Sequence, residues 1–148
     1  MDDLKNRTLT LERTFDAPIE LVWEAWTQTE HIAHWWAPPG IELEIVEHDF
    51  QEGGNWKYLM KMKDGNAFVA EGQYERIEAP TLLITSANFR PMTEGVTMEV
   101  HLKADGNKTQ FTFNVIHPTV EYCKAQEEMG FYNGWGSAFE RLADMVEG

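Results

Sequence analysis

The chain has 148 residues with 12 basic and 25 acidic side chains, a formal net charge of −13, and 43% of its residues are hydrophobic. This length suits one domain, residues 1–148, that buries most of the surface of its unfolded chain. The negative charge argues against nucleic acid and anionic membranes as partners, because both attract a positive surface. The single cysteine, Cys123, allows no internal disulfide and is typical of a reducing compartment. We therefore expect a cytoplasmic domain without a signal peptide or a membrane span.

The first part of the chain predicts a strand followed by two short helices. Residues 7–15 alternate apolar and polar side chains, which is typical of a strand with one buried face. Asp16 is a candidate N-cap, and the apolar positions from Ile19 onward follow helical spacing. A second helix is expected over residues 29–35, and the prolines and glycine of residues 38–40 end it.

The middle of the chain predicts an antiparallel meander, because alternating segments are joined by short turns. The Asp64-Gly65 pair is its strongest hairpin signal. Near the end of the meander, Met98 falls on an apolar face, whereas Glu99 and His101 fall on the solvent side. The predicted strands lie near residues 41–50, 56–63, 67–77, 82–88, 96–102 and 109–116.

The last segment predicts one long helix that begins after Thr119, a candidate N-cap, and lasts nearly to Gly148. Its apolar residues recur at three- and four-residue spacing. An amphipathic helix that follows a curved antiparallel sheet is expected to lie across the concave apolar face. The predicted fold class is therefore α+β.

Three glycines, Gly130, Gly134 and Gly136, lie within this predicted helix. Each opposes helix formation by about 1 kcal/mol relative to alanine. They either let the helix approach or bend over the sheet, or they leave space for a ligand. The sequence leaves both explanations open.

Five short motifs occur in register along nearly the whole chain. Together they resemble the START-like, helix-grip (SRPBCC) superfamily and, within it, the AHSA1-like branch, which is named after the C-terminal domain of the activators of the heat-shock-protein ATPase and has polyketide cyclase/dehydrase relatives. The resemblance implies a START/Bet v 1-like fold, in which a curved antiparallel sheet of six to seven strands grips a long C-terminal helix around an internal cavity. The motifs are Phe15-Asp16-Ala17-Pro18 with Val22-Trp23-Glu24-Ala25-Trp26-Thr27, Trp35-Trp36 with Pro39-Gly40, Gly53-Gly54-Asn55-Trp56, Glu71-Gly72, and Met129-Gly130 with Gly134-Trp135-Gly136.

Aromatic and methionine side chains are the candidates for lining such a cavity, with ordinary core packing as the alternative for each of them. Trp35 and Trp36 are adjacent, so we expect one in the core and the other at the cavity mouth. Trp56 and Trp135 are better candidates because glycines stand beside both, with Gly54 leaving space next to Trp56. The predicted cavity residues are Trp35, Trp36, Trp56, Tyr58, Met60, Glu71, Phe89, Met98, Phe113, Met129 and Trp135.

Glu71 is the best candidate for a catalytic residue. If its side chain points inward, burial raises the pKa of its carboxyl and makes it a general acid or base. If it points outward, it is a solvated carboxylate. Arg90, in the loop that follows Phe89, is a candidate contact for an anionic ligand head.

Other motifs for catalysis and cofactor binding are incomplete. His31 and His34 offer two metal ligands, but zinc needs three or four. The glycine pairs lack the further residues of a phosphate loop or a dinucleotide fingerprint, and no serine stands in a nucleophile elbow. We therefore predict no metal and no cofactor.

The favoured interpretation is a domain that binds a small hydrophobic or amphipathic molecule in the cavity between sheet and helix. The alternative is a cyclase- or hydrolase-type enzyme that uses the same cavity. A second alternative is a module that contacts a heat-shock ATPase chaperone, although one domain fills the chain and leaves no room for the separate chaperone-binding domain of the eukaryotic activators. A homodimer is left open.

Overall fold

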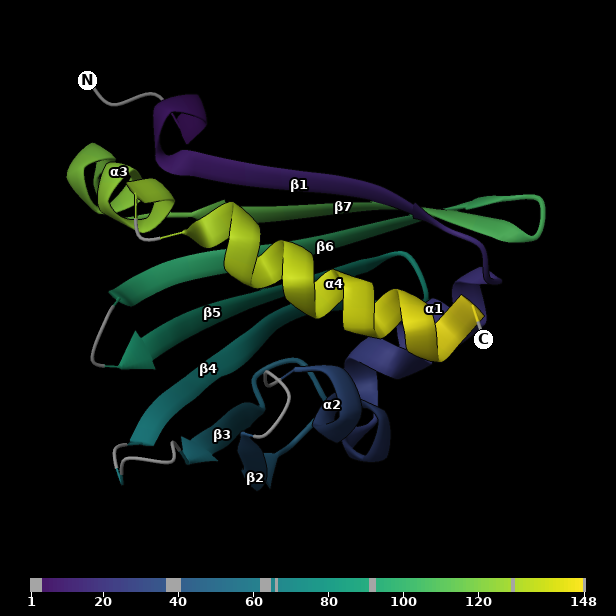
Figure 1. Cartoon of the computed structure of the whole chain (residues 1–148), viewed down its shortest axis with the longest axis horizontal. Coiled ribbons are helices and arrows are strands. Elements are labelled where there is room, and N and C mark those ends of the chain that lie inside the picture. Colours follow the sequence, from purple (N-terminus) through teal and green to yellow (C-terminus); the bar gives the residue numbers. More distant parts are fainter. Residues whose placement is uncertain are drawn as a thin grey trace.

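The computed structural model describes residues 4–36, 41–61, 65, 67–90, 93–128 and 130–147. One curved antiparallel sheet forms the frame, and the longest helix crosses one of its faces (Figure 1). The elements in chain order are η1 (Leu4–Arg7), β1 (Thr8–Phe15), α1 (Ile19–Thr27), α2 (Thr29–Trp35), β2 (Glu42–His48), β3 (Asn55–Lys61), β4 (Ala67–Glu78), β5 (Leu82–Arg90), β6 (Thr93–Asp105), β7 (Lys108–Ile116), α3 (Val120–Glu128) and α4 (Phe131–Glu147).

The seven strands lie in the order β1-β7-β6-β5-β4-β3-β2. Strands β2 to β6 each pair with the next strand in the chain, as the alternating pattern predicted. Strand β1 joins at the far edge, where Thr8 lies opposite Ile116 of β7. Helices α1 and α2 carry the chain from β1 at one edge of the sheet to β2 at the other.

The core lies between the inner face of the sheet and the apolar side of α4. Phe111 and Phe113 of β7 are buried, and their ring centroids lie 4.8 and 5.2 Å from that of Phe139 on α4. Each such side chain contributes roughly 1.5–3 kcal/mol through its burial. Arg141 also ties α4 to the end of α2, because its Nε donates a hydrogen bond to the carbonyl oxygen of Trp35 at 3.1 Å. These contacts hold the helices against the sheet.

The C-terminal region forms two helices, so the prediction of a single long helix is wrong. Gly130 lies between α3 and α4 with a φ of +99°, a backbone conformation that glycine adopts without steric cost. Thr119 caps α3 as predicted, since its Oγ1 accepts a hydrogen bond from the backbone N–H of Tyr122 at 3.1 Å. Asp16 does not cap α1, because the cap position falls on Pro18, two residues later.

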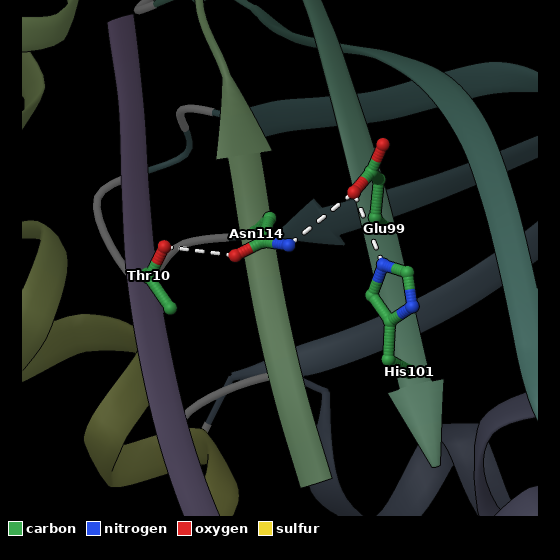
Figure 2. Close-up of polar contacts among 4 residues, drawn as sticks. All are labelled: Thr10, Glu99, His101 and Asn114. Carbon is green, nitrogen blue, oxygen red and sulfur yellow. Dashed lines mark hydrogen bonds and ion pairs between the residues drawn. The ribbon is translucent and has the colours of Figure 1, made fainter. Parts of the chain in front are cut away.

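The outer face of the sheet is polar. Glu99 accepts hydrogen bonds from Asn114 Nδ2 at 3.3 Å and from His101 Nε2 at 3.1 Å, and Thr10 donates to Asn114 (Figure 2). Met98, beside Glu99 in the strand, faces the core and is buried. This alternation on β6 is the predicted one. Within the part of the chain that the structure describes, no helix is both long and apolar enough to cross a membrane.

Candidate functional site

A small cavity lies between helices α1 and α2 and strands β3 to β6. Its volume is about 20 Å³, which accommodates about one water molecule. The described residues of α4 do not line it directly. The lining residues are Trp26, Trp36, Trp56, Tyr58, Tyr74, Leu83, Thr85, Met98 and Val100.

Four of the residues expected at a cavity lie in this wall, namely Trp36, Trp56, Tyr58 and Met98. The others lie elsewhere. Trp35 and Phe113 are fully buried in the core, and Trp35 Nε1 donates to the carbonyl oxygen of Ala25 at 2.8 Å. Met60, Phe89 and Trp135 are half-buried and pack against the core, and Met129 lies outside the described residues.

Trp56 reaches across the sheet to a polar partner. Its Nε1 donates a hydrogen bond to Thr85 Oγ1 at 2.8 Å, and Thr85 donates in turn to the carbonyl oxygen of Gln73. A Cβ at Gly72 would lie 2.9 Å from Trp56 Nε1 and would collide with the carbonyl oxygen of Ser86. The glycine that makes room for Trp56 is therefore Gly72.

The sequence predicted that Gly54 leaves space beside Trp56, and this prediction is wrong. A Cβ at Gly54 would collide with the backbone of Asp49. Gly54 is thus needed for a close backbone approach in the turn before β3, and it does not border the indole.

Two phenols of the cavity wall, Tyr58 and Tyr74, share the imidazole of His48 as a polar partner. His48 Nε2 lies 2.8 Å from the carbonyl oxygen of Thr27, which can only accept, so Nε2 carries the proton. His48 Nδ1 is then the acceptor, with the hydroxyl of Tyr58 at 3.0 Å and that of Tyr74 at 3.5 Å. Burial raises the pKa of Tyr58 well above its ordinary value and that of Tyr74 to about 12. Both phenols therefore remain neutral at ordinary pH.

Trp26 is another buried polar side chain of the wall. It is 4% exposed, and its Nε1 has no hydrogen-bond partner among the described residues. Aromatic rings surround it, with the centroid of Trp35 at 4.7 Å and that of Trp36 at 6.3 Å. Rings offer a buried N–H at most a weak contact. Trp26 therefore lines the cavity with its ring and carries a buried N–H without a hydrogen-bond partner among the described residues.

The sequence did not single out Trp26, Tyr74, Leu83, Thr85 or Val100 as cavity residues. Val100 shares the inner face of β6 with Met98, so strand alternation was a sufficient signal for it. No comparable signal existed for Trp26, since the rotation of α1 about its axis decides which of its tryptophans faces the cavity.

Trp135 covers the cavity wall from the α4 side. Its ring centroid lies 5.4 Å from that of Trp36 and 6.0 Å from that of Phe89. A Cβ at Gly134 or Gly136 would meet nothing within 4 Å. These two glycines therefore do not serve a close approach of helix to sheet.

Glu71 lies on the outer face of the sheet. Ala70 and Tyr74 are buried on the inner face of β4, and the pleat directs an odd-numbered position between them to the opposite side. Glu71 stands opposite Lys57 of β3 and Asn88 of β5. This placement corrects the expectation that Glu71 belongs to the internal cavity. It lines a polar groove of about 440 Å³ together with Glu47, Asn55, Trp56, Lys57, Gly72, Gln73, Ser86 and Asn88.

The remaining candidates are the metal ligands and the anion contact Arg90. Within the described ranges, no three His, Cys, Asp or Glu side chains come together in a group that would hold a metal ion. The side chain of Arg90 lies outside the described part of the structure.

Comparisons with known proteins agree with this architecture. The family model for Activator of Hsp90 ATPase homolog 1-like protein matches residues 16–147. A protein from Nitrosomonas europaea has a similar structure with a TM-score of 0.84, 26% sequence identity, and coverage of 99% of this chain and 98% of that one. A protein from Arthrobacter aurescens gives a TM-score of 0.88 at 25% identity, with coverage of 99% and 90%.

A third structure, the AHSA1-like protein from Aeromonas hydrophila, gives a TM-score of 0.75 at 24% identity and covers 95% of this chain and 92% of its own. No curated protein matches the sequence significantly. The structural likenesses confirm the predicted α+β, helix-grip fold class.

Proposed function

The chain belongs to the Activator of Hsp90 ATPase homolog 1-like family, and from this premise we propose that it binds a small, mainly apolar molecule between its sheet and its helices. The observation that carries the proposal is the cavity itself, whose wall combines tryptophans with the polar side chains of Tyr58, Tyr74 and Thr85. Protein interiors are close-packed, and their voids are few. Ligand sites are characteristically apolar and aromatic with a few placed polar groups, which describes this wall.

The cavity must enlarge to hold an organic molecule. A volume of about 20 Å³ is far below the roughly 300–1,000 Å³ of typical ligand pockets. Trp135 is the side chain whose movement would enlarge it, because it is half-buried and contacts Trp36 in the wall. Gly134 and Gly136, on either side of Trp135 in the sequence, carry no side chain that would obstruct the indole as it turns outward. In this proposal Trp135 is a gate, and the ligand takes the place of its ring against Trp36.

A binding experiment with a matched control tests this gate. Cumene, an apolar probe, is titrated into the wild type, Trp135→Ala and Tyr132→Ala while binding is followed by NMR. Tyr132 precedes Trp135 on the same helix and is 40% exposed, so its removal should leave cumene affinity unchanged. Trp135→Ala should bind cumene about tenfold more tightly, because the closed state no longer competes with the ligand. If cumene binds neither the wild type nor Trp135→Ala at millimolar concentration, the proposal fails.

The enzyme alternative has no candidate acid or base at the cavity, because Glu71 lies on the outer face of the sheet. Contact with a heat-shock ATPase rests on the family name alone, and a pulldown with that ATPase combined with an ATPase assay would test it. A homodimer is tested by light scattering. The proposed location is the cytoplasm, in keeping with a lone buried thiol at Cys123.

A further inference from the structure

We infer that the bound molecule is a flat, uncharged aromatic compound of two fused rings, and that the indole of Trp135 occupies its place in the closed state. The inference rests on the proposed function and names the ligand class of the same site. The side chain that the ligand displaces thus serves as a template for the ligand.

The indole of Trp135 is held among four aromatic rings, which come from β5, β7, α4 and the end of α2. The centroid distances are 4.8 Å to Phe113, 5.4 Å to Trp36, 5.8 Å to Phe139 and 6.0 Å to Phe89. Trp36 and Phe89 lie nearly perpendicular to the indole, with interplanar angles of 87° and 77°. Aromatic pairs favour edge-to-face and offset arrangements at these separations. The space that the indole fills therefore suits another flat aromatic body.

Trp135 can leave its place at a lower cost than two other tryptophans of the interior. Trp35 and Trp56 each donate their indole N–H to a protein acceptor at 2.8 Å, so moving either ring would break a hydrogen bond. The indole of Trp135 makes no hydrogen bond to the described residues, and it is only half-buried. A ligand that offers the same ring contacts can therefore replace it without the loss of a polar interaction.

A saturated ligand would fit this place less well than an aromatic one. Saturated rings bury apolar area, but they lack the quadrupole that makes edge-to-face contacts with Trp36 and Phe89 favourable. They are also thicker than an aromatic plane. A single aromatic ring would leave part of the indole's space unfilled, and voids in a close-packed interior are costly. Two fused aromatic rings meet both requirements.

The rings that enter are uncharged because of what surrounds them. The described residues that line the cavity include no arginine, lysine or carboxylate, and the four rings around Trp135 carry no charge. A charge buried there without a partner would carry a large desolvation cost. The net charge of −13 further disfavours an anion through the field of the whole protein.

Two probes with the same carbon skeleton test the inference. 2-Naphthol and decahydro-2-naphthol are both neutral at pH 7 and carry the same hydroxyl, so they differ in aromaticity and flatness. Each is titrated into the wild type, Phe89→Leu and Phe50→Leu while binding is followed by NMR. Phe89→Leu removes one of the four rings and keeps an apolar side chain. Phe50 supplies the matched control, because it is also half-buried and packs on Trp23 and Tyr74 instead.

The wild type and Phe50→Leu should bind 2-naphthol about tenfold more tightly than the saturated probe. This ratio corresponds to about 1.4 kcal/mol, which one favourable aromatic pair can supply. In Phe89→Leu the ratio should fall to about threefold. In the wild type, nuclear Overhauser effects should connect 2-naphthol with the ring of Phe113, and those between Trp135 and Phe113 should disappear. These wild-type readouts decide the matter even if Phe89→Leu does not fold.

Equal affinity of the wild type for the two probes would overturn the inference and leave the proposed function intact. So would contacts between Trp135 and Phe113 that persist at saturating 2-naphthol, or a ratio that Phe89→Leu and Phe50→Leu leave equally unchanged. Binding of cumene that is tighter than that of 2-naphthol would also overturn the inference alone. Failure of cumene and of both naphthol probes to bind would overturn the inference and the proposed function together.

Discussion

The indole nitrogen of Trp56 on β3 donates a hydrogen bond to the hydroxyl of Thr85 on β5, across the whole width of β4. The indole crosses β4 at Gly72, which is the residue paired with Trp56 in the sheet. A glycine in the interior of a strand usually marks a close approach of this kind. The wall of the cavity thus depends on a residue that has no side chain.

Gly72→Ala should destabilise the protein by about 2–3 kcal/mol, a cost typical of overpacking in a core. The new Cβ would collide with the carbonyl oxygen of Ser86 and crowd Trp56 Nε1, so both the backbone and the hydrogen bond to Thr85 must give way. Urea denaturation measures the change. Thr85→Val removes the hydroxyl that accepts from Trp56 and donates to Gln73, and should cost about 1–3 kcal/mol. A Gly72→Ala protein as stable as the wild type would contradict the described packing.

Gly134→Ala should have the opposite effect. Gly134 is exposed within α4, and a Cβ there would meet nothing within 4 Å. Alanine in an exposed helix interior is more stable than glycine by about 0.5–1 kcal/mol. Thermal unfolding should therefore show a higher Tm. A loss of stability would mean that the helix packs more closely at this position than the structure shows.

The stability of the protein should fall on acidification in part through His117. This residue is 2% exposed, its Nδ1 lies 3.1 Å from the carbonyl oxygen of Arg7, and burial lowers its pKa below the ordinary value of about 6.5. The unfolded chain then binds more protons than the native protein as the pH falls below about 6.5. The free energy of unfolding therefore decreases with falling pH.

His117→Asn keeps a hydrogen-bond donor near the Arg7 carbonyl but does not titrate. Urea denaturation between pH 7.5 and 5 should show a smaller decrease in the free energy of unfolding for this variant than for the wild type. Equal decreases in the two proteins would show that His117 carries none of the pH dependence.

Glu71→Gln should leave the binding of cumene unchanged within about twofold. The side chain lines the outer polar groove, whereas the cavity lies on the inner side of the sheet. Isothermal titration calorimetry measures the affinity. A tenfold loss would mean that Glu71 acts at the cavity after all, and would restore it as a candidate acid or base.

The strands were predictable because their side-chain period is short and repeated. Met98 and Val100 alternate with polar residues, and this alternation fixes which of them faces the core. The break before α4 was not predictable in the same way. Gly130, Gly134 and Gly136 look alike in the sequence, and only Gly130 has a positive φ. The distinction arises from tertiary packing rather than from local preference.

Residues of the site were predictable only on strands, where the alternation of side chains decides which face each residue occupies. Tyr58 follows from the alternation of β3, but the apolar run Phe68-Val69-Ala70 before Glu71 concealed its orientation. Val69 lies two residues before Glu71, so the two share the outer face, and Val69 is only partly buried there. For Trp26, helical spacing placed it near Trp23 without deciding which indole meets the cavity. The unsatisfied N–H is visible only once the surrounding rings are in place.

The pairing of β1 with β7 sets the order in which the chain is completed during synthesis. Hairpins between successive strands allow β2 to β7 to assemble as they emerge, whereas Thr8 waits for Ile116. Contacts so distant along the chain close late and slow folding. Phe15 meets Phe111 across this same pair of strands, with ring centroids 5.3 Å apart. The first strand made is therefore the last to join, and the aromatic core is sealed from that edge only after the seventh strand has been translated.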